Sequence, residues 1–306
     1  MRLVFAGTPA AAVPTLRRLA TSHDIAAVVT RPDAPLGRRR VLTPSPVAQA
    51  AEELGLPVLK TARLDDAATA EISALQVDLG VIVAYGGLVR EPLLTAPTAG
   101  WINLHFSLLP AWRGAAPVQR ALIAGDRVLG ASVFQLVAEL DAGDVFAMRE
   151  VYVPATATAG EALEVLASDG AELVADVVSA IEAGTAEAVA QDGEPTFAAK
   201  LAHADGLLEW SEPLSAVFAR FRGVTPEPGA HTIVGGQPLK VLEAHPAPDA
   251  EPLAPGRLRG TKSALHIGTA DGALAVTRVQ PAGKGAMNAV DWWRGLRGGD
   301  ELVAGA

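Results

Sequence analysis

The residues best suited to chemistry in this sequence are an amide and an imidazole that stand two positions apart, Asn103 and His105. They end a strand predicted over 100–105, and alternate residues of a strand project from the same face. We therefore expect the two side chains to lie side by side. Further along the chain, Asp141 offers a carboxylate at a second predicted strand exit. An amide, an imidazole and a carboxylate together are suited to acyl transfer without a covalent intermediate.

The chemistry of amine attack on a carbonyl explains why these residue types fit. Negative charge collects on the carbonyl oxygen, and an amide N–H from Asn103 can donate to it, an interaction worth about 3 kcal/mol. A protonated His105 can donate as well, and the charge of Asp141 would favour that protonated form. Asp141 can also relay a proton away from the amine, directly or through water.

Purely structural roles for these residues stay open at this point. Asn103 and His105 could simply cap backbone groups at a strand end, and Asp141 lies in an Asp-Ala-Gly sequence typical of turns. A metal site is not expected, because the chain has no cysteine and no pair of histidines at helical spacing. Ser107 is close to His105, but no Gly-x-Ser-x-Gly motif accompanies it. Gly7 is not followed by the Gly-x-Gly-x-x-Gly pattern of dinucleotide sites.

The elements that must position these residues alternate between strands and helices. Apolar, β-branched runs predict strands over 2–6, 24–30, 58–59, 77–84 and 100–105. This alternation predicts an α/β fold, a mostly parallel sheet with helices on both faces. Ligands of such sheets bind beyond the carboxyl ends of the strands. Tyr85 and Gly86, Asn103 and His105, and Asp141 are all expected at such ends, so they form one candidate site.

The second half of the chain has a different texture. A long helix is predicted over 160–184, and the weakly periodic segment 185–205 is predicted to be a linker. After it, short apolar runs alternate with glycine and proline turns, interrupted by a helix over 214–222, which predicts a small β-barrel. The predicted domains are therefore 1–184 and 206–306.

Composition narrows the class of protein. The chain has 306 residues, of which 50% are hydrophobic, and a net charge of −9 that argues against general coating of nucleic acid. The absence of cysteine suits a reducing cytosol. The apolar run 2–6 is too short for a signal peptide, and the uncharged stretch 92–112 is broken by three prolines, so no membrane span is expected. These features predict a cytoplasmic protein.

Positive charge is concentrated in one long loop over 31–40. Three consecutive arginines lie there, Arg38, Arg39 and Arg40. This loop is longer than the connection of about 2–6 residues that is usual between a strand and a helix. It is either a solvated basic turn or a single docking point for the phosphates of a nucleic acid.

The chain resembles the methionyl-tRNA formyltransferase family nearly from end to end. The resemblance is carried by stretches around the segments above and by one near the C-terminus: 5–9, 32–38, 44–47, 84–86, 103–110, 112–120, 140–144 and Gln-Pro-Ala-Gly-Lys at 280–284. The triad Asn103, His105 and Asp141 alone indicates the wider superfamily that uses 10-formyltetrahydrofolate. The arginine loop and the C-terminal domain narrow the resemblance to the tRNA enzymes.

The resemblance implies a Rossmann-like catalytic domain, an OB-like C-terminal domain that binds tRNA, and formyl transfer from 10-formyltetrahydrofolate to methionyl initiator tRNA. It implies that Asn103, His105 and Asp141 are catalytic and that the arginines contact the acceptor stem. It also implies a folate site, made by Ser107, Leu108, Leu109, Pro110, Tyr85 and Gly86. Two alternatives stay open: formyl transfer to a small amine such as a sugar nucleotide, and a non-catalytic RNA-binding protein.

Overall fold

The computed structural model describes residues 1–37, 40–296 and 302–305, which form two compact units. The N-terminal unit comprises Met1–Pro117, Val128–Tyr152 and Leu163–Ala198. The C-terminal unit comprises Val118–Arg127, Val153–Ala162 and Ala199–Ala306. These units interleave along the chain, whereas the predicted domains follow one another.

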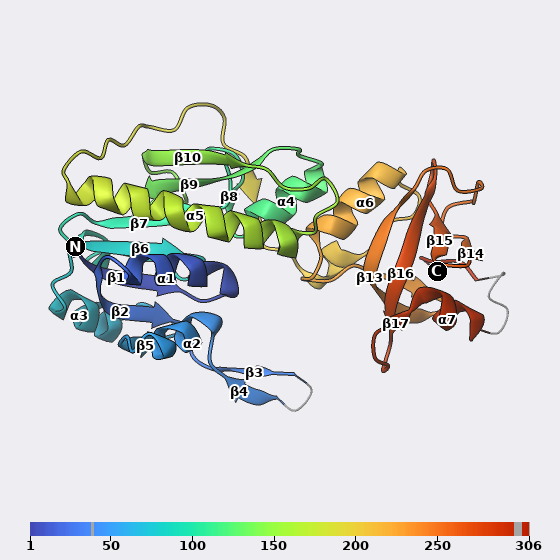
Figure 1. The fold of residues 1–306 in the computed structure, drawn as a ribbon, viewed down its shortest axis with the longest axis horizontal. Helices are drawn as coiled ribbons and strands as arrows, with labels where there is room; N and C mark the ends of the chain where they lie inside the picture. The colour runs from blue at the N-terminus through green and yellow to red at the C-terminus, as the bar shows by residue number, and fades with distance from the viewer. Residues whose placement is uncertain (38–39, 297–301, 306) are drawn as a thin grey trace. The chain divides into compact units, whose positions relative to one another are not determined.

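The N-terminal unit is built on a seven-stranded sheet with the order β10-β9-β7-β6-β1-β2-β5 (Figure 1). Its strands are β1 (Arg2–Gly7), β2 (Asp24–Thr30), β5 (Val58–Lys60), β6 (Leu79–Val83), β7 (Trp101–His105), β9 (Leu129–Gln135) and β10 (Val145–Val151). The strands from β5 to β7 in this order run parallel, while β9 is antiparallel to β7 and β10 antiparallel to β9. The mostly parallel sheet predicted from the alternation is confirmed.

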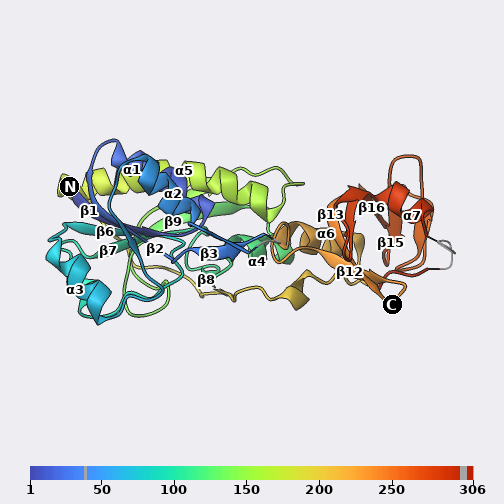
Figure 2. The same cartoon turned by 90° about the horizontal axis from the view of Figure 1, so that it is seen from below.

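Helices cover both faces of this sheet, as predicted. α1 (Val13–Ala20), α2 (Pro46–Glu53) and the long α5 (Ala159–Glu182) lie on one face, and α3 (Asp66–Ala74) lies on the other (Figure 2). Two short 3₁₀ turns, η1 (Ala10–Ala12) and η2 (Leu93–Thr95), complete the connections.

Side-chain caps begin two of these helices. The Ser45 hydroxyl accepts the Ala48 amide at the start of α2, and the Asp65 carboxylate accepts the Ala68 amide at the start of α3. Such caps stabilise a helix by about 1 kcal/mol each.

Two small pairs of strands lie outside the main sheet. The long arginine loop contains an antiparallel hairpin, β3 (Ala34–Leu36) and β4 (Val41–Thr43). The short strand β8 (Arg113–Gly114) pairs in parallel with β11 (Phe197–Ala198). Thus part of the segment predicted as a linker is hydrogen-bonded to the N-terminal unit.

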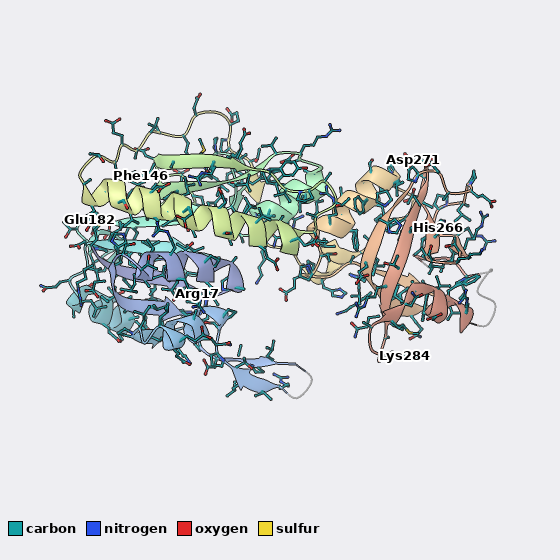
Figure 3. All side chains as sticks on the ribbon, in the orientation of Figure 1. Arg17, Phe146, Glu182, His266, Asp271 and Lys284 are labelled. Carbon is teal, nitrogen blue, oxygen red and sulfur yellow. The ribbon has the colours of Figure 1, made fainter. Side chains whose placement is uncertain are left out.

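The C-terminal unit contains a six-stranded antiparallel sheet with the order β12-β13-β16-β15-β14, to which β17 adds beside β16. Its elements are α4 (Pro117–Ala124), η3 (His203–Gly206), α6 (Leu214–Gly223), β12 (His231–Val234), β13 (Gln237–Ala247), β14 (Leu258–Gly260), β15 (Leu265–Gly268), β16 (Ala273–Pro281), β17 (Met287–Asn288) and α7 (Ala289–Arg294). The Asp271 carboxylate, labelled in Figure 3, accepts the amide of Leu214, the first residue of α6, at 2.7 Å. Apolar residues of α6 share one core with the inward faces of β15 and β16.

The last described residues connect the two edges of this sheet. Ala304 forms an antiparallel bridge with Val234 of β12, and Val303 forms one with Arg257, which precedes β14. The sheet therefore curls into the small barrel predicted from its short strands. None of the helices in the described ranges has the length and apolar character that crossing a bilayer requires.

Candidate active site

Strand β7 carries Asn103 and His105 on one face of the sheet. Asn103 is paired with Ile82 of β6 and with Phe134 of β9, and His105 is paired with Ser132. Residues directly opposite in a ladder share a face, so the ring of Phe134 lies beside His105 with its plane almost perpendicular, at 6.4 Å between centroids. The imidazole is 6% exposed. The strand thus presents both polar groups as the alternation predicted.

The imidazole of His105 is held in one tautomer. Its Nε2 lies 2.8 Å from the Trp112 carbonyl oxygen, and since a carbonyl only accepts, Nε2 carries the proton. The other nitrogen, Nδ1, faces Asp141 Oδ2 at 3.8 Å.

Burial lowers the pKa of His105 below its usual value, and this effect exceeds the opposing effects of the Asp141 charge and the Trp112 carbonyl. The Asp141 charge does favour the protonated ring, as the sequence predicted, although burial has the larger effect. A lowered pKa favours the neutral ring, in which Nδ1 carries a lone pair that can accept a proton.

Asp141 reaches His105 by a route that the sequence did not indicate. Because β9 runs antiparallel to β7, its last residue, Gln135, pairs with Ile102 and not with His105. The prediction that all three segments leave the sheet at one edge is thus wrong for Asp141. The segment 136–144 folds back and brings the carboxylate to the imidazole.

A backbone amide fixes the Asp141 carboxylate. Asp141 is 9% exposed, and its Oδ2 accepts the Gly114 amide at 2.7 Å. Gly114 has φ +122°, and a Cβ there would stand 2.7 Å from the Ala198 carbonyl oxygen, so only glycine fits. Asp141 itself has φ +48°, a left-handed conformation that its neighbours must hold in place.

Asn103 contains a buried polar atom for which the described part of the chain supplies no partner. Its Oδ1 has no hydrogen-bond partner among the described residues. An unpaired buried oxygen costs about 1–3 kcal/mol, and capping of a backbone group does not account for it. Since amide O and N are assigned by their partners, this position offers either an acceptor or a donor to a group from outside the chain.

The candidate folate turn is rigid. The fully buried Ser132 hydroxyl donates to the Ser107 carbonyl oxygen at 2.7 Å and accepts the Leu109 amide at 3.1 Å. The Ser107 hydroxyl donates to the Ala111 carbonyl oxygen at 2.5 Å, and the Leu109 side chain packs against Phe134. Leu108 and Pro110 remain partly exposed in this turn, so they are the residues of the turn best placed to meet a ligand.

The other candidate folate residues follow β6, the parallel neighbour of β7, and so leave the sheet at the same edge as His105. The Tyr85 ring is 1% exposed in the core, with the Arg31 guanidinium 5.8 Å from its centroid. Arg31 also donates to the carbonyl oxygens of Gly86 and Ala62. Tyr85 could therefore offer a ligand only its backbone, while Gly86 is exposed.

Of the three arginines, the structure describes only Arg40, which directly precedes β4. Arg38 and Arg39 are outside the described residues, whereas Arg40 is exposed and its amide donates to the Gly37 carbonyl oxygen at 3.1 Å. The flanking apolar side chains Leu36 and Leu42 are each 66% exposed. The hairpin thus presents apolar and cationic groups together.

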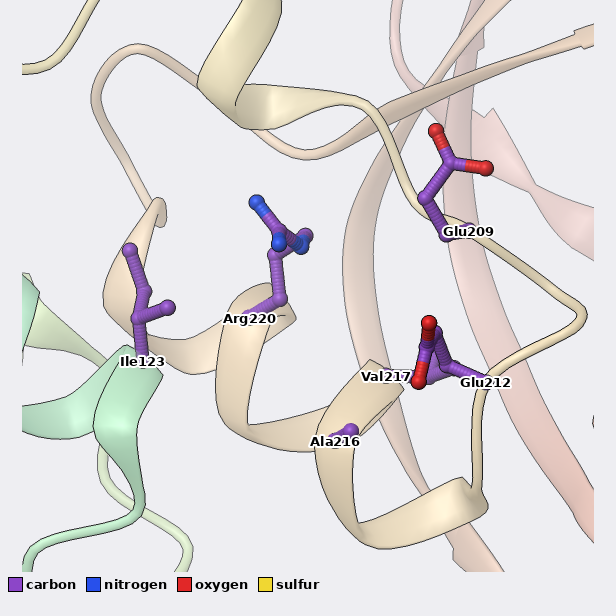
Figure 4. Close-up of a pocket in the computed structure, with 6 residues that line it drawn as sticks. All are labelled: Ile123, Glu209, Glu212, Ala216, Val217 and Arg220. Atoms are coloured by element: carbon purple, nitrogen blue, oxygen red, sulfur yellow. The ribbon is translucent and has the colours of Figure 1, made fainter.

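A separate hollow of about 270 Å³ lies in the C-terminal unit (Figure 4). It is lined by Ile123, Glu209, Glu212, Ala216, Val217 and Arg220. The Arg220 guanidinium donates to the Asp205 carbonyl oxygen at 3.2 Å.

Within the described ranges, no cluster of three or more histidine, aspartate or glutamate side chains could hold a metal ion.

Comparison with known proteins places this geometry in a family. The formyl transferase family model matches residues 1–178, and its C-terminal domain model matches residues 200–297. The methionyl-tRNA formyltransferase of Clavibacter sepedonicus is 60% identical over 99% of this chain and 100% of its own length. The chain belongs to the methionyl-tRNA formyltransferase family. The enzyme of that name from Leifsonia xyli subsp. xyli is 56% identical, also over 99% of this chain and 100% of its own length.

Solved structures share the fold at much lower identity. A variant of HypX from Aquifex aeolicus superposes with a TM-score of 0.70 at 17% identity and covers 97% of this chain and 48% of its own. WlaRD, a sugar 3N-formyl transferase, superposes with a TM-score of 0.69 at 12% identity and covers 93% and 98%. These likenesses support the fold alone.

Three further residues shape this site and could not be identified from the sequence. The Ser132 hydroxyl donates to the Ser107 carbonyl oxygen, and Arg113 is 8% exposed and lies near Glu139 of the Asp141 turn. Gln191 is hydrogen-bonded to both Arg113 and Asp141. Arg113 directly precedes Gly114, but nothing in the sequence pairs it with the weakly periodic segment that contains Gln191.

Proposed function

We propose that this chain transfers a formyl group from 10-formyltetrahydrofolate to the amino group of methionyl initiator tRNA, in the cytoplasm. The identity of 50–60% to methionyl-tRNA formyltransferases along nearly the whole chain supports the reaction and both substrates. The single structural observation that carries the site is the buried pair of His105 and Asp141, with Nδ1 and Oδ2 3.8 Å apart, on the same sheet face as Asn103.

The proton balance of the reaction gives His105 its role. When the amine attacks the formyl carbon, the carbonyl oxygen becomes negative and the amine nitrogen positive. One proton must leave that nitrogen, and one must reach the departing nitrogen of the folate. The neutral His105 accepts the first proton at Nδ1, where the Asp141 carboxylate stabilises the resulting imidazolium. The imidazolium can then supply the second proton.

The oxyanion is held by the Asn103 amide. The sequence predicted His105 as a second donor, but its one N–H already donates to the Trp112 carbonyl oxygen. We therefore assign Asn103 to the oxyanion and the pair of His105 and Asp141 to proton transfer. The turn from Ser107 to Pro110, together with Gly86, provides the wall for the flat folate ring system.

The assignments of the tRNA-binding parts of the chain rest on its membership of the methionyl-tRNA formyltransferase family. The arginines Arg38, Arg39 and Arg40 contact tRNA phosphates. The region 206–306 binds the rest of the tRNA, while the first part of the segment 185–205, up to Ala198, belongs to the N-terminal unit that carries the candidate site. No metal takes part in the proposed reaction, because its charges and protons are handled by the Asn103, His105 and Asp141 side chains.

One assay separates this function from its alternatives. The protein is incubated with the folate donor in two parallel reactions, one with charged initiator tRNA and one with an amino sugar nucleotide as acceptor. Mass spectrometry then shows whether either acceptor carries a new formamide. Formylation of methionyl-tRNA supports the proposal. Formylation of the sugar alone would make the chain a small-amine formyltransferase. Folate-independent RNA binding with no formamide on either acceptor would leave only an RNA-binding protein.

A further inference from the structure

The side chain of Gln191 lies between two segments of the candidate site. Its Nε2 donates to the carbonyl oxygens of Asp141 at 2.8 Å and of Gly143 at 2.9 Å. Its Oε1 accepts from Arg113, at 2.7 Å from Nη2 and 3.2 Å from Nε. Both N–H groups and the oxygen of the carboxamide are therefore in use, which is the full capacity of a glutamine.

These bonds close a ring with the carboxylate that the mechanism uses. Arg113 is followed by Gly114, whose amide donates to Asp141 Oδ2 at 2.7 Å. The ring thus runs from the Asp141 carboxylate through Gly114 and Arg113 to Gln191, and returns to the Asp141 backbone. A carboxylate held at its side chain and at its own carbonyl group has little freedom to turn away.

The Asp141 turn needs such support. Asp141 has φ +48°, a backbone conformation that non-glycine residues rarely adopt and that costs on the order of 1–3 kcal/mol. The Arg113 guanidinium is buried, and its remaining nitrogen, Nη1, lies 3.5 Å from Glu139 Oε1 in the same turn. Gln191 is thus the only residue that bonds to both the left-handed turn and the buried cation among the contacts of the described residues.

We propose that Gln191 is a positioning residue for the transfer reaction: its carboxamide fixes the turn so that the Asp141 carboxylate faces His105 Nδ1. This inference rests on the proposed roles of Asp141 and His105. Gln191 acts through Asp141 and touches neither substrate.

The Gln191→Glu and Gln191→Met variants test this role. Glutamate keeps the acceptor for Arg113 but replaces the two donors with an oxygen that repels the Asp141 and Gly143 carbonyl oxygens. Methionine keeps the length and removes all four bonds. The exposed Glu194, which takes no part in the ring, gives the matched control Glu194→Gln.

We expect both Gln191 variants to lower kcat by about 10- to 100-fold, because a displacement of about 1 Å in a catalytic group has that effect. The KM values for the folate donor and for methionyl-tRNA should stay within about twofold of the wild-type values, because Gln191 contacts neither substrate. The Glu194→Gln variant should match the wild type. Thermal melts establish that each variant is folded at the assay temperature.

A double-mutant cycle with Asp141→Asn distinguishes positioning from general stability. If Gln191 acts through the Asp141 carboxylate, Gln191→Glu should slow Asp141→Asn little further. The amide of Gly114 gives a readout without activity, since its hydrogen exchange should accelerate in both Gln191 variants.

The inference is overturned if the Gln191 variants keep wild-type kcat, or if their loss adds in full to that of Asp141→Asn. Protection of the Gly114 amide that is unchanged in both variants would overturn it as well. Failure of the proposed function gives a different result: wild-type protein that leaves methionyl-tRNA unformylated, or Asp141→Asn that turns over at the wild-type rate.

Discussion

Replacing Asp141 by asparagine removes one negative charge from the candidate site and keeps the shape of the side chain. Asparagine can still accept the Gly114 amide, which now bonds to Asp141 Oδ2 at 2.7 Å. The group that loses most is His105, whose Nδ1 lies 3.8 Å from the same oxygen. Both side chains are buried, so water cannot solvate a protonated His105 in place of the lost carboxylate.

The size of the effect follows from this separation. Two unit charges about 4 Å apart interact by about 4 kcal/mol at an effective dielectric constant of about 20. In the proposed mechanism His105 is neutral before the reaction, so this attraction exists only once the imidazole has taken the proton. An interaction made only in the reacting state changes kcat and not substrate binding. We therefore expect Asp141→Asn to lower kcat by up to about 10³-fold.

Single-turnover formylation of methionyl-tRNA across a pH series measures this effect. The matched control is Asp144→Asn, which removes an exposed carboxylate from the same turn and should leave the rate unchanged. Since burial lowers the pKa of His105 below its usual 6.5, the fall in wild-type rate caused by protonation of this ring should appear only below pH 6.5. The midpoint of that fall should move lower still in Asp141→Asn, because the Asp141 charge raises the pKa of His105. A rate loss below tenfold, or an equal loss in the control, would refute the proton-transfer role.

Three further predictions concern neighbouring parts of the site. Asn103→Ala should lower kcat by about 10²–10³-fold through loss of the oxyanion donor, with unchanged folate affinity by calorimetry; a weakened affinity and an intact kcat would contradict this. Replacing Arg38–Arg40 by glutamine should weaken tRNA binding and reduce the slope of log K against log salt by about 1 for each phosphate that is no longer neutralised; an equal slope would exclude the hairpin from the interface. Ser132→Ala leaves the Ser107 carbonyl and the Leu109 amide unpaired and should cost about 1–3 kcal/mol in unfolding free energy, measured by chemical denaturation against the wild type.

Local patterns in the sequence were sufficient to predict the sheet and part of the site. The apolar, β-branched runs at 2–6, 24–30 and 77–84 correspond to β1, β2 and β6, because buried parallel strands need such side chains on both faces. Strand alternation alone predicted the shared face of Asn103 and His105. These properties depend on residues close together in sequence.

Properties that depend on distant parts of the chain could not be predicted in the same way. The direction of β9, which decides how Asp141 approaches His105, leaves no mark on its composition. The lowered pKa of His105 follows from its burial, which depends on the Trp112 and Asp141 segments that lie against it. Gln191 lies in a segment without periodicity, and only the folded backbone brings it to Arg113.

The bridges made by Val303 and Ala304 have a consequence for how the protein is made. These residues join the two edges of the barrel's sheet, at β12 and just before β14. Contacts between segments so far apart in sequence form late and slowly. During synthesis the N-terminal unit can fold while this sheet still has two open edges. The barrel must therefore close after residue 304 has been synthesised, and until then its unpaired edge strands can pair with another chain.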